Sequence, residues 1–557
     1  MPATESDDLL LASAQAALGR VRDYWELAKV SAYRAVTDQG SIDPGAIDAG
    51  LFDRAQRRMH ALAWVATALE GLVQLEGWYA RLAREGSSSI GEKLVLSIGF
   101  GEYLAQILGG LPMSQNELIR PADLRAEEAA ALLRSQAPIQ YFLTAGNTVS
   151  NRAELAALLA GGWRPNERFG DEDLDMMREQ VRRFTEDEIL PRAQTWHLAD
   201  ALIPDQVVSQ MAALGIFGVC IAPEYGGAGL GKLAMCVVSE ELSRGWIAAG
   251  SLGTRSEIAA ELIATNGTPE QQRRWLPGIA SGKVIPTAVF TEAGAGSDLA
   301  SLTTRATPDG EGGWRITGAK CWITHAARSD LMTLLARTGT EPGRHDGLSM
   351  FLAAKQRARP DDDFPDVGLQ GSEVQVLGYR GMREYVLAFE DFRVGAEGLL
   401  GSSQGAGFRQ LMRTFESARI QTAARAVGVG RRALELGLAY ALERRQFGRP
   451  LAEFPRIADK LAMMTVETVV ARELTYFAAR RKDAGARCDV QAGMAKLLAA
   501  RVAWSNADAA LQIHGGNGYA LEYEISRILC DARILNIFEG AAEIQATVVA
   551  RGLLTRA

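Results

Sequence analysis

The chain of 557 residues is 47% hydrophobic and 23% charged, which is typical of a globular protein with several domains and excludes a largely disordered one. Its formal net charge of −7 argues against a protein whose main ligand is nucleic acid. The five cysteines form no CxxC pair and no spacing of metal ligands, so we expect reduced thiols and no metal site. No uncharged apolar run reaches the ~20 residues of a membrane-spanning helix.

Residues 1–165 predict an N-terminal helical extension. Its first residues, Met1–Asp8, are acidic and lack the basic and then apolar order of a signal peptide, so we expect a cytoplasmic protein. Within Met59–Glu85 the apolar residues recur at the i, i+3, i+4, i+7 steps of one buried helical stripe. The loop-like stretch 161–166 ends this region. No residue in it carries evident chemistry, and a role as an interaction module stays open.

The remaining chain predicts three regions in the order helical, strand-rich, helical. Residues 166–285 and 403–557 carry helical patterns, whereas 286–402 contains short apolar and β-branched runs bounded by Gly and Asp. Three such runs are Trp314–Gly318, Leu331–Ala336 and Glu384–Phe389. An antiparallel β domain between helical layers gives an α+β class and not a doubly wound sheet.

A glycine-rich loop stands at the start of the strand-rich region. Phe290–Asp298 contains a string similar to GxGxxG, which in a βαβ unit would bind a dinucleotide at the start of a helix. The residues that follow, Leu302–Ala306, have the pattern of a strand. We therefore reject a Rossmann interpretation and retain a ligand-binding turn, with an ordinary β-turn as the alternative.

Two segments near the C-terminus combine close backbone approach with a lone carboxylate. Gln512–Tyr519 holds a glycine pair, which lets main chain approach a ligand. Asn536–Gln545 places Glu539 between Phe538 and Gly540. A carboxylate in apolar company is poorly hydrated and is a better base at neutral pH, so Glu539 is the candidate general base.

These motifs together resemble the acyl-CoA dehydrogenase family. Phe290–Asp298 is similar to its TEPGAGSD signature with Ala293 in place of Pro, and Lys320–His325 is similar to its K-x-W-I-T-N strand. Glu443–Gly448 resembles the segment that family members insert towards the flavin of a neighbouring subunit. The resemblance spans roughly residues 167–557. It implies the family's fold preceded by an extra helical domain, and it implies FAD as cofactor.

The resemblance also implies which residues in the strand-rich region hold the cofactor. Phe290 and Thr291 would contact the flavin, and Ser297 the cofactor pyrophosphate and the pantetheine chain of the substrate. Trp322 would pack on the isoalloxazine, and Thr324 would hydrogen-bond near its reactive N5 edge. His325 stands where Asn is usual, and we assign it no catalytic role.

The C-terminal residues implied to bind the cofactor come from more than one subunit. Arg444 suits a pyrophosphate because its guanidinium is planar with several donors, and it would reach the cofactor of a neighbouring subunit together with Phe447. This implies a homo-oligomer, a dimer or a tetramer. The remaining cofactor residues implied are Gln512, Gly515, Gly516 and Glu543. Ala541 stands where a hydroxyl is commoner, which weakens a side-chain contact there.

The family's chemistry is α,β-dehydrogenation of an acyl-CoA thioester. The resemblance implies that Glu539 removes the α-proton, that the β-hydrogen leaves as hydride to flavin N5, and that electron-transferring flavoprotein reoxidises the flavin. Some relatives carry the base immediately before an arginine. That position is Ala418 here, so the alternative base is absent and Glu539 remains the candidate base. Arg419 and Gly540 are then assigned to the substrate.

The extension and the segment Leu377–Tyr385 resemble most closely the branch of the family that converts (2S)-methylsuccinyl-CoA to mesaconyl-CoA in the ethylmalonyl-CoA pathway. A buried far carboxylate needs a cationic partner, and Arg255 is the candidate anchor, with a surface ion pair as the alternative. Another short branched or glutaryl-type acyl-CoA is the second hypothesis, and an oxygen-using oxidase is a further one. A flavin-bearing protein that acts on nucleic acid is the alternative from another class.

Overall fold

The computed structural model describes residues 6–37, 46–341 and 343–555. The chain divides into two compact units, one made of residues 1–172 with 422–557 and the other of residues 173–421. The boundaries of the four domains expected from the sequence remain a prediction.

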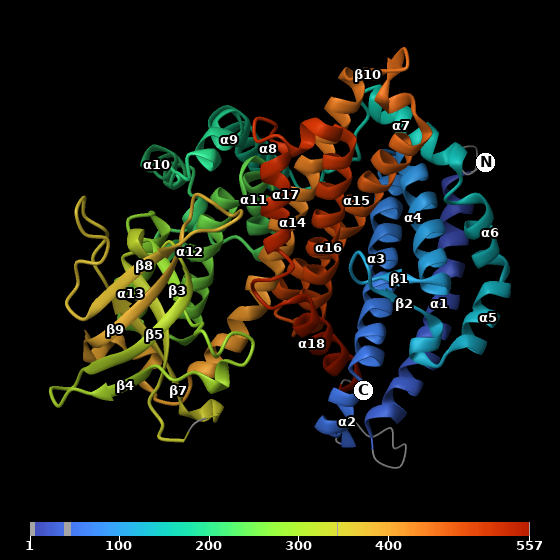
Figure 1. Cartoon of the computed structure of the whole chain (residues 1–557). Coiled ribbons are helices and arrows are strands. Elements are labelled where there is room, and N and C mark those ends of the chain that lie inside the picture. The colour runs from blue at the N-terminus through green and yellow to red at the C-terminus, as the bar shows by residue number, and fades with distance from the viewer. Residues whose placement is uncertain (1–5, 38–45, 342, 556–557) are drawn as a thin grey trace. The chain divides into compact units, whose positions relative to one another are not determined.

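The first unit begins with the helices of the N-terminal extension (Figure 1). Its long helices are α1 (Asp7–Val36), α3 (Gln56–Arg84), α4 (Ile90–Gly109) and α7 (Val149–Ala160). Shorter elements are α2 (Ala49–Arg54), β1 (Leu111–Pro112), β2 (Leu118–Ile119), α5 (Glu127–Ser135) and α6 (Ala137–Ala145).

Local capping explains where α4 begins. Ser89 is the N-cap, and the carboxylate of Glu92 accepts a hydrogen bond from the Ser89 N–H at 3.0 Å, which completes a capping box. The other Glu92 oxygen accepts from the N–H of Asn166 at 3.1 Å. One buried carboxylate thus ties the start of α4 to the loop-like stretch that was expected to end the extension.

The rest of the first unit is a bundle of long C-terminal helices. These are the end of α14 (Gly407–Glu443, of which residues from 422 belong here), α15 (Pro455–Asp483), α16 (Asp489–His514), α17 (Ile525–Ile534) and α18 (Ala542–Thr555). The short strands β10 (Arg445–Gln446) and β11 (Arg449–Pro450) form a hairpin between α14 and α15.

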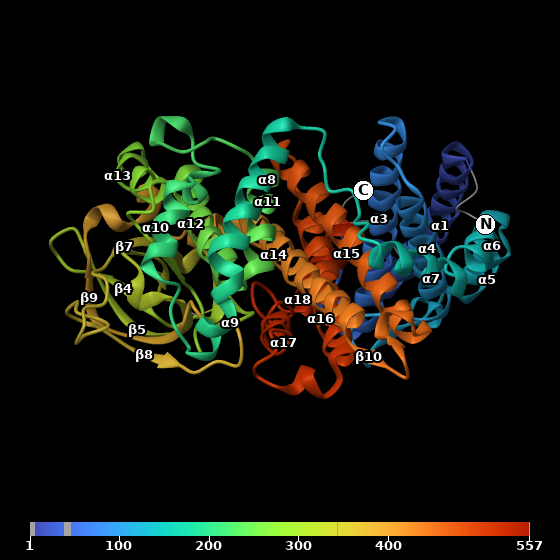
Figure 2. The same cartoon turned by 90° about the horizontal axis from the view of Figure 1, so that it is seen from above.

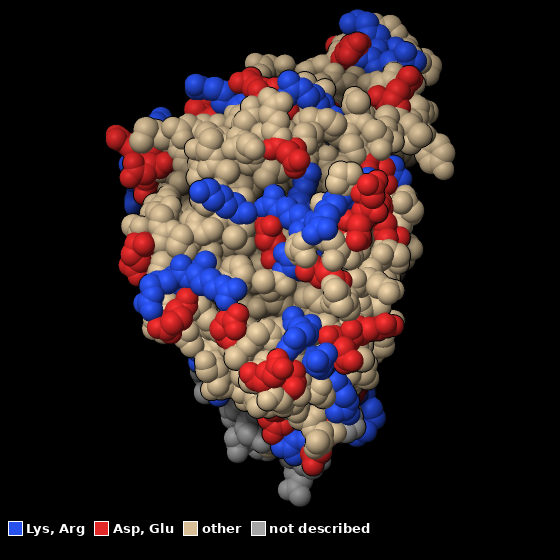
Figure 3. Space-filling view, turned by 90° about the vertical axis from the view of Figure 1, so that its left-hand side faces the viewer, with Lys and Arg blue, Asp and Glu red and all other residues tan. Residues whose placement is uncertain are grey.

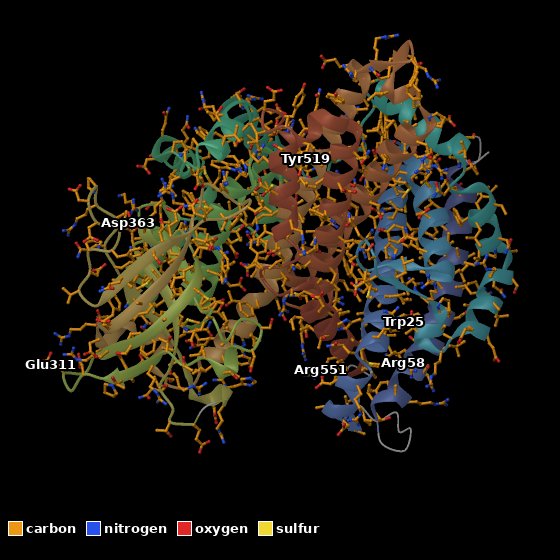
Figure 4. All side chains as sticks on the ribbon, in the orientation of Figure 1. Trp25, Arg58, Glu311, Asp363, Tyr519 and Arg551 are labelled. Carbon is orange, nitrogen blue, oxygen red and sulfur yellow. The ribbon has the colours of Figure 1, made fainter. Side chains whose placement is uncertain are left out.

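The extension packs directly on this bundle. Helix α3 contacts α15, α16 and α18 as well as α1 and α4, and Figures 1 and 2 show the extension helices beside α15. The Tyr33 hydroxyl donates to the Leu554 carbonyl, and the His60 ring lies 3.1 Å from the Thr547 hydroxyl. The guanidinium of Arg551, labelled in Figure 4, lies 5.1 Å from the centre of the Phe52 ring.

The second unit combines helices with one sheet. Its helices are α8 (Glu172–Phe184), which continues as a short π-helix (Thr185–Ile189), α9 (Leu190–Leu198), α10 (Asp205–Ala213), α11 (Lys232–Gly245), α12 (Ile247–Asn266), α13 (Pro269–Ala280) and the start of α14. Its strands are β3 (Pro286–Val289), β4 (Arg305–Pro308), β5 (Trp314–Thr324), β6 (Leu331–Arg337), β7 (Leu348–Ala354), β8 (Leu369–Val374) and β9 (Glu384–Val394).

The strands are ordered β3-β6-β4-β5-β9-β8, and β7 pairs with β6. The β4–β5, β5–β9, β8–β9 and β6–β7 pairs are antiparallel, whereas β3–β6 and β4–β6 are parallel. The sheet is therefore rich in antiparallel pairs, but it is not the purely antiparallel sheet that the sequence had suggested. Strand β6 has seven consecutive buried residues, which fits a strand covered on both faces.

The α+β class is confirmed, with helical regions on either side of the strand-rich region along the chain. Among the described residues, no helix combines the length and the apolar character needed to cross a membrane.

Candidate active site

The predicted glycine loop follows β3 and leaves its main chain open. Glu292 and Ala295 pair across the turn. A side chain built on Gly294 or Gly296 would meet no atom within 4 Å, and Ser297 is exposed. Open main chain and an exposed hydroxyl are the groups that can approach phosphate oxygens closely.

A buried ion pair fastens this loop to the sheet, and the sequence analysis missed it. The Glu292 carboxylate accepts hydrogen bonds from the N–H groups of Thr303 at 2.7 Å and Thr304 at 2.9 Å. The Lys320 ammonium donates to Glu292 at 3.0 Å and to the Phe290 carbonyl at 2.9 Å. The Lys320 side chain is fully buried, so the loop is held from inside the sheet.

Burial and charge act in opposite directions on this pair. Burial alone would raise the pKa of Glu292, but the Lys320 charge and the hydrogen bonds from Thr304 and Thr303 lower it to about 2. Burial lowers the pKa of Lys320 to about 8, against the attraction of Glu292. Both groups are therefore charged at neutral pH, and the pair is ionic.

Trp322 lies where β5 departs from regular pairing. The register of β5 with β9 shifts between Lys320 and Ile323, and Trp322 has a φ of +58°. Its side chain is 59% exposed, which is unusual for a Trp within a strand. An indole presented in this way has a free surface on which a planar ring could pack.

The next site residue, Thr324, joins a chain of polar groups. Its hydroxyl donates to the buried Glu384 carboxylate, whose oxygens lie 2.9 and 3.2 Å away. The Arg255 guanidinium on α12 donates to the same hydroxyl oxygen at 3.4 Å. The structure thus brings together Arg255 and Thr324, which the sequence analysis assigned to different ligands, and adds Glu384, which it missed.

His325 has a structural role. Its ring is buried with Nε2 2.9 Å from the Pro286 carbonyl, and burial lowers its pKa to about 3. The imidazole is therefore neutral at physiological pH.

Phe290 and Arg419 lie at opposite ends of a short aromatic row. The Phe290 ring meets the Phe415 ring edge-on at 6.3 Å, and the Arg419 guanidinium lies 6.0 Å from the Phe415 ring centre. Ala418 is buried, so the position at which some relatives carry the base has no acidic side chain here.

In the first unit, Glu539 occupies a strained turn between α17 and α18. Its φ is +55°, and that of Gly540 is +91°. Glu539 is half-buried, whereas Ile537 is 52% exposed. The apolar shielding expected from the sequence is therefore incomplete, because only part of the flanking apolar surface is withdrawn from water.

The predicted glycine pair ends α16. Gly515 has a φ of +60°, and a side chain built on Gly515 or Gly516 would meet no atom within 4 Å. Gln512 is exposed beside them, and Glu543 is exposed in the first turn of α18. The loop continues to Tyr519, which is 90% exposed and labelled in Figure 4.

Side chains missed by the sequence analysis brace this glycine loop. The Asn517 amide donates to the hydroxyls of Tyr440 at 3.0 Å and Tyr523 at 2.9 Å. The His514 ring stacks on Tyr440 at 4.2 Å. The aromatic residues were visible in the sequence, but Tyr440 is 77 residues from Asn517, so only the fold reveals the pairing.

Phe447 is at the tip of the β10–β11 hairpin. Its φ is +51° and its side chain is 93% exposed. The ring meets Phe454 edge-on at 6.2 Å, and the Arg449 guanidinium lies 4.1 Å from the Phe454 ring. Arg444 is exposed just before the hairpin. The exposed Phe447 ring is thus available for contact with another surface.

Each set of assigned residues, taken within its own unit, offers groups that suit part of a dinucleotide cofactor. In the second unit they offer open main chain, a hydroxyl and an exposed indole, which suit phosphates and an aromatic ring system. In the first unit they offer a second glycine turn, an exposed amide and an exposed guanidinium. Each set is assembled by contacts within its own unit.

Family models match most of the chain. The N-terminal domain of acyl-CoA dehydrogenases matches residues 171–283, the middle domain 287–392 and the C-terminal domain 405–554. The chain is 55% identical over 549 residues, 98% of either chain, to (2S)-methylsuccinyl-CoA dehydrogenase of Cereibacter sphaeroides. It is 36% identical over 384 residues to probable acyl-CoA dehydrogenase YngJ of Bacillus subtilis, covering 68% of this chain and 97% of the relative.

Solved structures agree over the same part of the chain. A glutaryl-coenzyme A dehydrogenase in complex with glutaryl-CoA aligns with a TM-score of 0.65 at 31% identity, over 69% of this chain and 95% of its own. Butyryl-CoA dehydrogenase from Megasphaera elsdenii aligns with a TM-score of 0.65 at 29% identity, over 68% of this chain and 98% of its own. A glutaryl-CoA dehydrogenase from Mycobacterium smegmatis in complex with FADH2 aligns with a TM-score of 0.63 at 27% identity, over 69% of this chain and 95% of its own. The chain therefore belongs to the acyl-CoA dehydrogenase family and is an FAD-dependent oxidoreductase that acts on CH–CH bonds.

Proposed function

We propose that this dehydrogenase converts (2S)-methylsuccinyl-CoA to mesaconyl-CoA. The observation that carries the proposal is the 55% identity to (2S)-methylsuccinyl-CoA dehydrogenase over 98% of both chains. That match runs through the N-terminal extension, whereas YngJ and the butyryl- and glutaryl-CoA dehydrogenases cover about two thirds of this chain.

Glu539 is the proposed base. A carboxylate at a turn between two helices removes the α-proton of the thioester, and the Glu539 N–H donates to the thioester carbonyl so that enolate character is stabilised. Gly540 adjoins the same carbonyl site without side-chain bulk. Bound FAD supplies the acceptor for the β-hydrogen. The role of the chain is to orient the thioester and to exclude water.

The residues proposed to bind the cofactor form two sets, one in each compact unit. Ser297 and the open glycine loop hold phosphate oxygens, Trp322 packs on the flavin, and Thr324 adjoins its N5 edge. Phe290 and Thr291 line the same region. The first unit contributes Gln512, Gly515, Gly516 and Glu543.

Arg255 is the proposed anchor for the far carboxylate of the substrate. It extends from α12 to within 3.4 Å of the Thr324 hydroxyl, the residue assigned to the flavin edge. A short dicarboxylic acyl group that reaches the flavin would bring its second charge close to this guanidinium, and an unpaired buried carboxylate is costly. Arg255→Ala should therefore lose the preference for dicarboxylic thioesters. Retained activity with an unchanged preference would rule the anchor out.

The exposed hairpin supports a homo-oligomer as part of the proposal. Arg444 and Phe447 would reach the cofactor of a neighbouring subunit, which explains why a Phe is 93% exposed at the hairpin tip. Electron-transferring flavoprotein is the proposed electron acceptor. The oligomeric state of the Phe447→Ala variant, measured by sedimentation, together with its FAD content, tests whether the hairpin reaches a neighbouring subunit.

Anaerobic bleaching of the flavin by a panel of acyl-CoAs tests the substrate. Bleaching by (2S)-methylsuccinyl-CoA but not by butyryl-, isobutyryl- or glutaryl-CoA supports the proposal. Bleaching by another thioester retains the class and discards the substrate. Rapid peroxide formation in air would favour an oxidase.

A nucleic-acid function has a weaker basis. On the face drawn in Figure 3, Lys and Arg side chains are interspersed with Asp and Glu and do not form one basic field. A salt-sensitive shift of DNA mobility would be needed to revive that hypothesis.

A further inference from the structure

The turn that carries Glu539 has a backbone conformation that its own sequence disfavours. Glu539 is in the left-handed region at φ +55°, followed by Gly540 at φ +91°. A glycine adopts such angles freely, but a glutamate does not. Strained backbone of this kind persists only where the surroundings over-determine it. Side chains packed against the turn must therefore impose its conformation.

Two buried side chains hold the carbonyls of the turn. The Gln545 amide on α18 donates to the Glu539 carbonyl at 3.1 Å and to the Gly540 carbonyl at 3.5 Å. The Lys496 ammonium on α16 donates to the Gly540 carbonyl at 2.6 Å. Both side chains belong to residues with 0% exposure. A methyl group on Gly540 would collide with the Gln545 amide, so the turn and its holder are closely fitted.

A third buried side chain contacts the residue before the base. The Arg425 guanidinium on α14 lies 5.0 Å from the centre of the Phe538 ring, and Arg425 also has 0% exposure. Arg425 donates to the Thr422 hydroxyl on its own helix at 2.8 Å, which restrains the guanidinium. Three helices therefore fasten three consecutive residues, 538, 539 and 540, from the buried side.

Burying an ammonium or a guanidinium costs free energy of desolvation, so such groups are poor choices if packing is the only requirement. A methionine would fill the place of Lys496 without that cost. A lysine that donates to a main-chain carbonyl instead fixes a direction, because the bond is charge-assisted and short.

We propose that Lys496, Gln545 and Arg425 are positioning residues that hold the Glu539 turn in its left-handed conformation and so direct the carboxylate for proton abstraction. The inference rests on the proposed role of Glu539 as base. None of the three touches substrate in this scheme. Their effect on the rate arises because proton transfer requires the base within hydrogen-bond reach of its proton, and small displacements reduce it strongly.

The test compares Lys496→Met and Gln545→Leu with the parent enzyme. Anaerobic stopped-flow bleaching at saturating thioester gives the reduction rate, and its concentration dependence gives the substrate Kd. We expect each variant to reduce at least tenfold more slowly, with a Kd changed less than threefold and FAD content retained. Hydrogen exchange of the amides in 537–541 should accelerate in both variants.

Lys355→Met is the matched control, because Lys355 is also a buried lysine that donates to carbonyls, those of Ser329 at 2.9 Å and Ala327 at 3.4 Å. It should lower the thermal midpoint while the reduction rate stays within twofold. A comparable rate loss in this control would show that any lost buried lysine slows the enzyme, and would overturn the proposal.

Two further outcomes separate the clamp formed by Lys496, Gln545 and Arg425 from the base assignment. If Glu539→Gln abolishes bleaching while Lys496→Met and Gln545→Leu reduce at the parental rate, the clamp is wrong and the base stands. If Glu539→Gln bleaches normally, the base assignment is wrong and the clamp proposal, which rests on it, falls with it, whereas the proposed reaction stands. Should both clamp variants fail to fold, exchange in the parent enzyme decides the clamp: slow exchange at 537–541 supports it, and exchange as fast as in an open loop refutes it.

Discussion

Lys320→Met should loosen the glycine loop that presents the predicted cofactor contacts. The substitution keeps the length of the side chain and removes its charge. It leaves the buried Glu292 carboxylate without its Lys320 partner and the Phe290 carbonyl without its 2.9 Å donor. The hydrogen bonds from the N–H groups of Thr303 and Thr304 would remain, but these donors carry no charge.

The expected loss is several kcal/mol. Removing one partner of a buried ion pair costs about 3–5 kcal/mol. The depressed pKa of Glu292, about 2 against 4.5, agrees in direction, because the Lys320 charge and the hydrogen bonds from Thr304 and Thr303 outweigh the effect of burial. For a unit of this size, a loss of about 3 kcal/mol lowers the thermal midpoint by roughly 6–12 °C.

Thermal unfolding followed by flavin fluorescence, together with the FAD content of the purified protein, measures this loss. Arg393→Met is the matched control, because Arg393 pairs with Glu311 (labelled in Figure 4) at 2.6 Å and with Asp309 at 3.3 Å from a guanidinium side chain that is more than half exposed. Such a surface pair contributes about 0–1 kcal/mol, so the control should unfold within a few degrees of the parent and retain FAD.

The dependence on pH provides the refutation. In the parent the folded pKa of Glu292 is depressed, so its contribution is complete above pH 4.5 and is lost as the pH falls towards 2. In Lys320→Met the attraction is gone, and protonation in acid removes the cost of burying the unpaired carboxylate charge of Glu292. The difference in midpoint should therefore shrink between pH 7 and pH 4. A difference that is the same at both values, or a variant as stable as the parent, would contradict the reasoning.

Three other predictions concern separate parts of the chain. Glu539→Gln should retain FAD but reduce it about 10²–10⁴-fold more slowly with substrate, measured by anaerobic bleaching, and a loss below tenfold would count against the base. His325 has a folded pKa of about 3 against 6.5, so protonation of the unfolded chain costs about 2 kcal/mol of stability at pH 5. His325→Asn should remove that acid sensitivity, and an unchanged slope of midpoint against pH would contradict it. Gly91→Ala would place a methyl group against the Trp163 indole, so it should cost about 1–3 kcal/mol in unfolding experiments while the rate of flavin reduction stays unchanged.

The sequence predicted the fold class because it depends on local patterns, and the site motifs, whose roles stay predictions, are local strings of the same kind. The periodicity of α3 and the β-branched runs of β5, β6 and β9 can be recognised within a few residues. The glycine loop and the Gln512–Gly516 turn carry their own signals. The parallel pairing of β3 with β6 escaped prediction, because the strand pattern of a short run does not identify its neighbour.

The residues that the sequence analysis missed are those whose meaning depends on distant partners. Glu292 and Lys320 are 28 residues apart, and neither is unusual within its own motif until β5 places the lysine beneath the loop. Glu384 gains significance only from the Thr324 hydroxyl, 60 residues away. In the sequence Lys496 is one of several charged residues on α16, and only the fold shows that its ammonium reaches the Gly540 carbonyl.

Helix α3 shows why the extension should not be considered a separate module. Its apolar spacing predicted one buried stripe, yet Leu62, Trp64 and Ala66 are all buried, as are the residues between them. A helix that is buried on all sides lies in the interior of a body. Here α1 and α4 cover one part of α3, and α15, α16 and α18 of the C-terminal bundle cover another. The extension and the bundle therefore share one core. Since α16 and α18 also carry Lys496 and Gln545, the core that the extension completes is continuous with the helices that hold the turn of Glu539.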